Sequence, residues 1–169
     1  MATFSLEEKI LKVNKKNFKY IQKGKGQLVL MIHGWPENCN SWLNQISFIS
    51  KLGYKAVAIN VRGYADSYSP NNIQSYKLKF FMEDIIDVIN YFNKENAILV
   101  GHDWGAPICW TTAAYYKEKI TAVIGLSVPF TRRGKISSTK LWQKLYKNIF
   151  FYQNYFCLLY TSPSPRDRH

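Results

Sequence analysis

The chain has 169 residues, of which 47% are hydrophobic and 16% aromatic, so it is long and apolar enough for one domain with a hydrophobic core and is not expected to be disordered. Its formal net charge is +12, but the lysines are scattered and no stripe of arginines with stacking aromatics is visible, so we expect no nucleic-acid partner. Three cysteines give no disulfide framework, and the sequence shows neither a signal peptide nor an uncharged apolar run of about 20 residues, so we expect a reducing, cytoplasmic compartment and no membrane span.

The first predicted elements are two strands of a hairpin, over 4–13 and 16–22. The continuous apolar run over 27–32 then predicts a strand that is buried on both faces. A helix follows, and we expect the side chain of Asn40 or Ser41 to cap its first turn.

The rest of the chain alternates between strand and helix patterns. This alternation is typical of an α/β fold, with a mostly parallel sheet, helices on both faces and right-handed crossovers. The predicted elements are a strand over 54–61, a loop over 63–72, a helix over 77–93, a strand over 97–100, a helix that ends near residue 117, and a strand over 120–127.

Four segments follow the carboxyl ends of the predicted parallel strands. In open α/β sheets, binding sites lie beyond these ends, so the four segments are expected at one edge of the sheet. They are His33-Gly34-Trp35-Pro36, Arg62-Gly63-Tyr64, Asp103 and Val128-Pro129-Phe130.

The segment Gly101-His102-Asp103-Trp104-Gly105 lies between a predicted strand and a predicted helix, which is the setting of a nucleophile elbow. Its central residue, Asp103, carries a carboxylate that is already charged at neutral pH and can displace a leaving group at an sp³ carbon, which gives a covalent ester. The alternative interpretation is an ordinary strand–turn–helix in which Asp103 only caps the helix.

Together these motifs resemble the α/β-hydrolase superfamily and, within it, the epoxide hydrolases. The matching segments are His33-Gly34-Trp35-Pro36-Glu37, Arg62-Gly63-Tyr64-Ala65-Asp66-Ser67, Gly101-His102-Asp103-Trp104-Gly105 and Ser127-Val128-Pro129-Phe130, and the resemblance covers roughly residues 4–131.

The resemblance implies specific roles for the residues of these motifs. Asp103 would be the nucleophile that opens the epoxide, and the backbone N–H groups of Trp35 and Trp104 would form the oxyanion hole. It also implies a cis peptide before Pro36. The expected partners are a small apolar epoxide and water, without a cofactor or a metal, and the oligomeric state is left open.

Other motif residues are expected to support the loops or the pocket: His33, Gly34, Pro36, His102 and Phe130. For His33 we favour bracing of the loop over an acid or base role, and His102 should be turned away from the pocket by the elbow. Asp66 and Ser67 are expected to tie down their loop. Asn60 and Ala65 depart from the family pattern, which often has Asp and Gly there.

We divide the chain into residues 1–130, the N-terminal part of the α/β-hydrolase core; residues 131–156, the start of a helical lid; and residues 157–169. The family places lid tyrosines, an acidic residue and a general-base His after this point. We therefore expect a fragment, truncated before the lid and the last strands, that turns over slowly or not at all. Residues 157–169 contain no Lys, Asn or Ile, and one back-translation of Cys157–Asp167 resembles a sequencing adapter, so we interpret them as an artefact. The alternative is a genuine tail rich in Pro and Ser.

Three other functions stay open at this point. A haloalkane dehalogenase uses the same scaffold and a Trp after the Asp, although such enzymes usually have Asn after the His-Gly pair. A non-catalytic α/β-hydrolase-like binding protein would not need the carboxylate at the elbow. A basic protein of the membrane surface would use residues 141–156.

Overall fold

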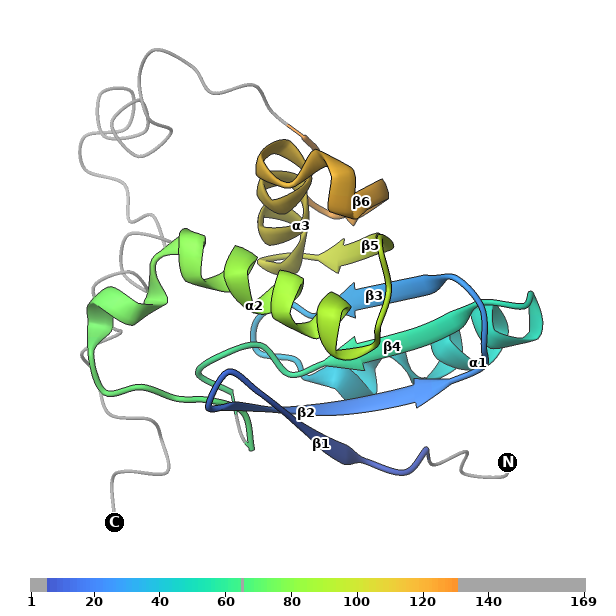
Figure 1. Ribbon diagram of the computed structural model, residues 1–169, viewed down its shortest axis with the longest axis horizontal. Helices are drawn as coiled ribbons and strands as arrows, with labels where there is room; N and C mark the ends of the chain where they lie inside the picture. The colour runs from blue at the N-terminus through green and yellow to red at the C-terminus, as the bar shows by residue number, and fades with distance from the viewer. Residues whose placement is uncertain (1–5, 65, 131–169) are drawn as a thin grey trace. The chain divides into compact units, whose positions relative to one another are not determined.

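The computed structural model describes residues 6–64 and 66–130, which contain a six-stranded sheet with helices on both faces (Figure 1). The domain predictions for 131–156 and 157–169 lie outside the described residues, as do Ala65 and the first five residues. The strands are β1 (Lys9–Val13), β2 (Lys16–Lys23), β3 (Leu28–Ile32), β4 (Lys55–Ile59), β5 (Ala97–His102) and β6 (Ile120–Leu126).

The order of the strands across the sheet is β1-β2-β4-β3-β5-β6. The hairpin strands β1 and β2 pair antiparallel, and β2 pairs antiparallel with β4. From β4 onward every neighbouring pair is parallel. The mostly parallel α/β sheet predicted from the alternating pattern is therefore confirmed.

The hairpin turn lies where the sequence predicts it, with Asn14 at φ 48° and Lys15 at φ 61°. Two successive residues with positive φ give the tight turn whose twist suits a two-residue hairpin loop. The first strand is shorter than expected, because Leu6, Glu7 and Glu8 precede β1 without joining it.

Side chains of the central strands alternate between two cores, one on each face of the sheet. On β3, Leu28, Leu30 and Ile32 enter one core, whereas Val29 and Met31 enter the other. All five are buried, which explains why this strand is apolar without interruption.

The two cores are covered by different helices (Figure 1). Ile46 of α1 (Leu43–Lys51) packs into the core of Val29 and Met31. The opposite core receives α2 (Leu78–Tyr91) and α3 (Gly105–Tyr115), through residues such as Ile85 and Ile108. Three short 3₁₀ turns complete the described elements: η1 (Cys39–Trp42), η2 (Ile73–Tyr76) and η3 (Lys117–Lys119).

The predicted cap of the first helix is wrong. The chain enters η1 before α1 begins, so the capping position moves back to Asn38, whose side chain accepts a hydrogen bond from the Asn40 N–H at 2.9 Å. Asn40 and Ser41 themselves lie inside the 3₁₀ turn, and α1 has no side-chain cap.

Candidate active site

Asp103 lies in a sharp turn between the end of β5 and the start of α3. Its φ of 48° is in the left-handed region, which a residue other than glycine rarely adopts. The turn also brings α3 very close to the neighbouring strand, because a Cβ on Gly105 would lie 2.2 Å from the Ile32 carbonyl oxygen, and one on Gly101 would lie 2.5 Å from the Gly105 oxygen. The two flanking glycines are thus sterically required, as predicted for an elbow.

The Asp103 carboxylate faces the loop after β3. Its Oδ1 accepts a hydrogen bond from the backbone N–H of Trp35 at 2.9 Å. A Cβ on Gly34 would lie 2.6 Å from the same Oδ1, so only glycine lets this backbone approach the carboxylate. The structure therefore brings Asp103 to Gly34 and Trp35, two consecutive residues that lie far from it in the sequence.

The simple helix-cap interpretation of Asp103 does not hold. The N-cap of α3 is Trp104, and no side chain caps this helix. The Asp103 main-chain oxygen instead accepts the N–H of Ala106 at 3.1 Å, while its carboxylate points to the β3 loop. The left-handed backbone of Asp103 is therefore not explained by capping of α3. Residues held in such rarely populated backbone conformations cluster at functional sites.

His33, for which we predict a loop-bracing role, is almost fully buried, with 1% of its surface exposed. Its Nδ1 lies 2.7 Å from the Gly34 carbonyl oxygen, and its Nε2 lies 3.2 Å from the Val61 nitrogen. Burial lowers the pKa of His33, and this effect outweighs the opposing influence of the Gly34 carbonyl and of Glu37. A neutral imidazole is therefore favoured.

His102 contacts the β3 loop rather than Asp103. Its Nδ1 lies 3.0 Å from Oε2 of Glu37, and both side chains are about one third exposed (35% and 37%). The Glu37 N–H donates in turn to the Gly34 oxygen at 3.1 Å. This pair links the elbow to the same loop that supplies the Trp35 N–H.

The aromatic residues of the predicted site are exposed: Trp35 by 52%, Trp104 by 44% and Phe130 by 58%. The peptide bond between Trp35 and Pro36 is cis, as the resemblance implies. The Trp104 N–H remains a predicted second donor of the oxyanion hole. Phe130 packs edge-on against the Trp110 ring of α3, with the ring centroids 5.9 Å apart.

Trp110 is a residue that the sequence analysis missed. Its indole N–H donates to the Val128 carbonyl oxygen at 3.1 Å, so α3 holds the segment that follows β6. A Cβ on Gly125 would lie 2.6 Å from the Trp110 ring, and this glycine leaves the space that the indole occupies. A large aromatic residue on the helix after the elbow was the available signal.

Arg62 is a structural residue, although it follows a strand end. It is 4% exposed, and its guanidinium binds both carboxylate oxygens of Asp84, at 2.6 and 2.7 Å. It also donates to the main-chain oxygens of Ser75 and Phe80, and thereby fixes the loop between β4 and α2. The sequence signal for this ion pair was Asp84, the single acidic residue at a buried position of the predicted 77–93 helix.

The loop residues near Arg62 have the supporting role that the sequence predicts. Asp66 pairs with Lys19 at 3.0 Å, and the Ser67 hydroxyl donates to the Asn60 oxygen at 2.8 Å. Asn60, the departure from the family pattern, accepts the Cys39 N–H on its own side-chain oxygen at 2.7 Å. It thus holds the start of η1.

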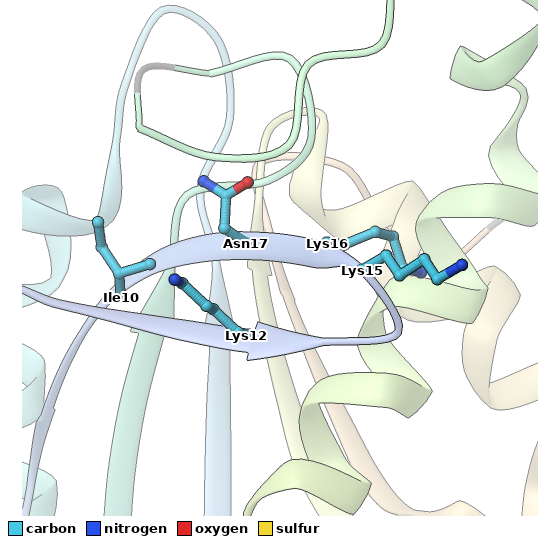
Figure 2. A pocket seen from close by; sticks show the side chains of 5 residues that line it. All are labelled: Ile10, Lys12, Lys15, Lys16 and Asn17. Carbon is cyan, nitrogen blue, oxygen red and sulfur yellow. The ribbon is translucent and has the colours of Figure 1, made fainter.

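A hollow of about 320 Å³ lies on the β1–β2 hairpin (Figure 2). Its described lining is largely cationic, but the Lys16 ammonium already contacts carboxylate oxygens of Asp84 and Asp87 at 2.6 Å each. The residues that line it are Ile10, Lys12, Lys15, Lys16 and Asn17, none of which belongs to a predicted site.

Neither a group of His, Cys, Asp or Glu residues suited to a metal ion nor a helix long and apolar enough to cross a membrane occurs within residues 6–64 and 66–130. Two cysteines in this part of the chain are buried and unpaired, and burial raises the pKa of the Cys39 thiol to about 11. A thiol with a raised pKa is a poor nucleophile at neutral pH, so Cys39 is not a candidate nucleophile.

Comparison with known proteins gives one consistent result. Residues 27–160 match the family model described as alpha/beta hydrolase fold. Over 111 residues the chain is 41% identical to epoxide hydrolase B of Mycobacterium tuberculosis, which covers 66% of this chain and 31% of that protein. The chain thus spans about a third of the length of this curated relative.

Solved structures agree with the sequence match. The epoxide hydrolase VrEH1 of Vigna radiata has a TM-score of 0.79 and 37% identity, over 86% of this chain and 48% of that one. Epoxide hydrolase A of Mycobacterium thermoresistibile has a TM-score of 0.85 and 32% identity, over 90% and 49% of the two chains.

Proposed function

We propose that this chain, which belongs to the α/β-hydrolase fold family and is similar to epoxide hydrolases, carries in Asp103 the nucleophile of an epoxide hydrolase. The observation that carries the proposal is the Trp35 N–H bound to Asp103 Oδ1 at 2.9 Å, at a residue held at φ 48°. A backbone donor is thereby aimed at the oxygen on which negative charge develops when an ester of Asp103 is hydrolysed.

The first proposed step forms a covalent ester. A carboxylate oxygen of Asp103 attacks one carbon of the epoxide, the C–O bond of the ring at that carbon breaks, and the released alkoxide takes a proton from a general acid. The product is a hydroxyalkyl ester on Asp103. No redox change and no cofactor is required.

The second proposed step returns the enzyme to its starting state. Water, deprotonated by a general base, attacks the ester carbonyl carbon, and the resulting oxyanion is stabilised by the N–H groups of Trp35 and Trp104. Collapse of this intermediate breaks the ester C–O bond. The leaving alkoxide takes the proton that the base removed from water and becomes the diol, and the Asp103 carboxyl group returns its proton to the general acid. The family resemblance assigns the acid and the base to the region after residue 130, outside the described residues.

Mass spectrometry of the chain after incubation with styrene oxide tests the proposal. We expect a mass increase equal to one epoxide, located on the peptide that contains Asp103. The Asp103→Asn variant should gain no such mass, whereas Asp66→Asn, which alters a carboxylate paired with Lys19, should react like the wild type. An adduct that persists in Asp103→Asn would refute the assignment.

The same experiment separates two of the other candidate functions, the haloalkane dehalogenase and the non-catalytic binding protein. Incubation with 1-chlorobutane in place of the epoxide should release no chloride, whereas a haloalkane dehalogenase would form an alkyl ester and free halide. A folded protein with an unmodified Asp103 under both conditions would instead be a non-catalytic binding protein.

A further inference from the structure

Both ring nitrogens of His33 are engaged by backbone groups of opposite kinds. Nδ1 lies 2.7 Å from the Gly34 carbonyl oxygen, which only accepts, and Nε2 lies 3.2 Å from the Val61 N–H, which only donates. These partners require an imidazole with a proton on Nδ1 and a lone pair on Nε2. His33 is therefore a neutral link between the loop after β3 and the end of β4.

The ring has little freedom to leave this position. It is 1% exposed, and Tyr64 packs edge-on against it with the centroids 4.5 Å apart. A buried ring with both nitrogens satisfied is held in one rotamer and one tautomer.

The hydrogen bond from His33 acts on the same peptide group that serves Asp103. The Gly34 carbonyl and the Trp35 N–H belong to one planar peptide and point in opposite directions. The oxygen of this peptide is held by two donors, His33 Nδ1–H at 2.7 Å and the Glu37 N–H at 3.1 Å. Its N–H donates to Asp103 Oδ1 at 2.9 Å, so fixing one end of the peptide aims the other.

We propose that His33 is a positioning residue, which holds the Gly34–Trp35 peptide so that the Trp35 N–H faces the Asp103 carboxyl group throughout the reaction. This inference rests on the proposed function. A donor to the carboxyl oxygen withdraws negative charge from the attacking carboxylate, but it stabilises the oxyanion of ester hydrolysis. Loss of His33 should therefore slow hydrolysis of the ester and leave its formation unchanged or faster.

Two amide variants separate the two hydrogen bonds of His33. In His33→Asn the side-chain nitrogen lies close to the former Nδ1 and can still donate to Gly34, whereas the acceptor for Val61 is lost. In His33→Gln the side-chain oxygen lies close to the former Nε2 and can still accept from Val61, whereas the donor to Gly34 is lost. Both variants lose one buried hydrogen bond, so a purely structural role predicts similar effects.

The measurement is the rate at which the Asp103 ester forms and the rate at which it decays in added hydroxylamine, by mass spectrometry after removal of styrene oxide. Hydroxylamine attacks the ester carbonyl through the same oxyanion and does not need the general base that the family resemblance places after residue 130. In His33→Gln we expect decay to slow by about tenfold or more, since deletion of a whole oxyanion donor costs about 10²–10³, with little change in formation. In His33→Asn both rates should stay near those of the wild type. Equal effects in the two variants, or a loss confined to formation, would overturn the proposal.

Nuclear magnetic resonance of the unreacted protein tests the positioning without any chemistry. The ¹⁵N shifts of the wild-type ring should report a neutral imidazole with its proton on Nδ1, and the Trp35 amide proton should shift when Asp103 is replaced by Asn. That amide shift should persist in His33→Asn and shrink in His33→Gln. A wild-type ring protonated on Nε2 at neutral pH would overturn the inference, and this test does not need the His33 variants to fold. A wild type that shows the expected signals but forms no ester would refute only the proposed function.

Discussion

At the scale of single residues, the candidate site depends on how closely backbone and carboxylate approach each other. Gly34 and Gly105 remove two Cβ atoms that would lie 2.6 Å from Asp103 Oδ1 and 2.2 Å from the Ile32 oxygen. Asp103 itself holds a left-handed backbone, at φ 48°. A carboxylate held in this way meets the Trp35 N–H without rearrangement, and such preorganisation is what lowers a barrier.

The buried state of His33 makes the stability of the protein depend on pH. Burial lowers the pKa of His33 in the folded chain, so the unfolded chain binds the proton more readily. Above the unfolded pKa of about 6.5, His33 is neutral in both states and does not reduce the stability of the folded protein. As the pH falls from this value toward the folded pKa, the free energy of unfolding decreases by about 1.4 kcal/mol for each pH unit.

Urea unfolding between pH 7.5 and 5.5 checks this dependence. We expect the wild type to lose stability over this range, and His33→Gln to lose less of it because no proton is taken up at position 33. The matched control is His33→Asn, which also has no titratable group at position 33 and should show the same reduced slope. An identical slope in wild type and His33→Gln would contradict a lowered pKa of His33 in the folded protein.

At the scale of elements, a buried charge network joins the hairpin, α2 and the loop after β4. Asp84 of α2 binds Arg62 through two oxygens and Lys16 at 2.6 Å. Asp87, one turn later, also contacts Lys16 at 2.6 Å and accepts from Asn14 at 2.7 Å. Desolvation acts against the Lys16 charge, but the bonds to the two carboxylates outweigh it, so the pKa of Lys16 is raised.

Substitution of the two acidic residues by amides should give unequal losses. Asp84→Asn leaves the Arg62 charge buried without its counter-ion, which costs about 3–5 kcal/mol. Asp87→Asn is the matched control, because its side chain is 17% exposed against 4% for Asp84, and Lys16 keeps a partner. The free energy of unfolding in urea is the measurement, and equal losses would contradict a buried Arg62–Asp84 pair.

At the scale of the whole molecule, the two outer strands of the described sheet differ in how they limit association. The β1 strand contains Lys9 and Lys12, and lysines on an edge strand hinder pairing with another chain. The β6 strand contains no charged residue, and it exposes Ile124 by 51% and Leu126 by 42%. Exposed apolar side chains on an uncharged strand favour self-association.

Ile124→Lys should therefore reduce self-association of the 169-residue chain, as measured by light scattering against concentration. The matched control is Ile10→Lys on β1, which is exposed to a similar degree (55%) but already lies among lysines. Neither substitution should change the unfolding free energy by more than about 0.5 kcal/mol, because both side chains are on the surface. A larger effect of Ile10→Lys would show that β6 is not the associating edge.

The sequence by itself determined the alternating elements, the parallel sheet and the motif positions at the strand ends, because apolar periodicity and glycine spacing are local properties. It also predicted that His33 braces a loop and that Asp66 and Ser67 hold theirs. It placed the first helix cap wrongly, because the 3₁₀ turn at Cys39 depends on how Asn60 holds that backbone, an interaction between distant segments.

Only the tertiary structure decided which atoms meet at the site. The Trp35 N–H reaches Asp103 Oδ1 because β3 and β5 are neighbours in register, with Ile32 opposite Gly101. Arg62, Asp84 and Trp110 acquired their partners in the same way, since a side chain finds a partner across the fold only when strand order and helix packing bring the two together. The spacing of motifs in the sequence predicts which residues are candidates for a site. A hydrogen bond, however, requires its two atoms to lie about 3 Å apart, and only the packing of the folded chain sets that distance.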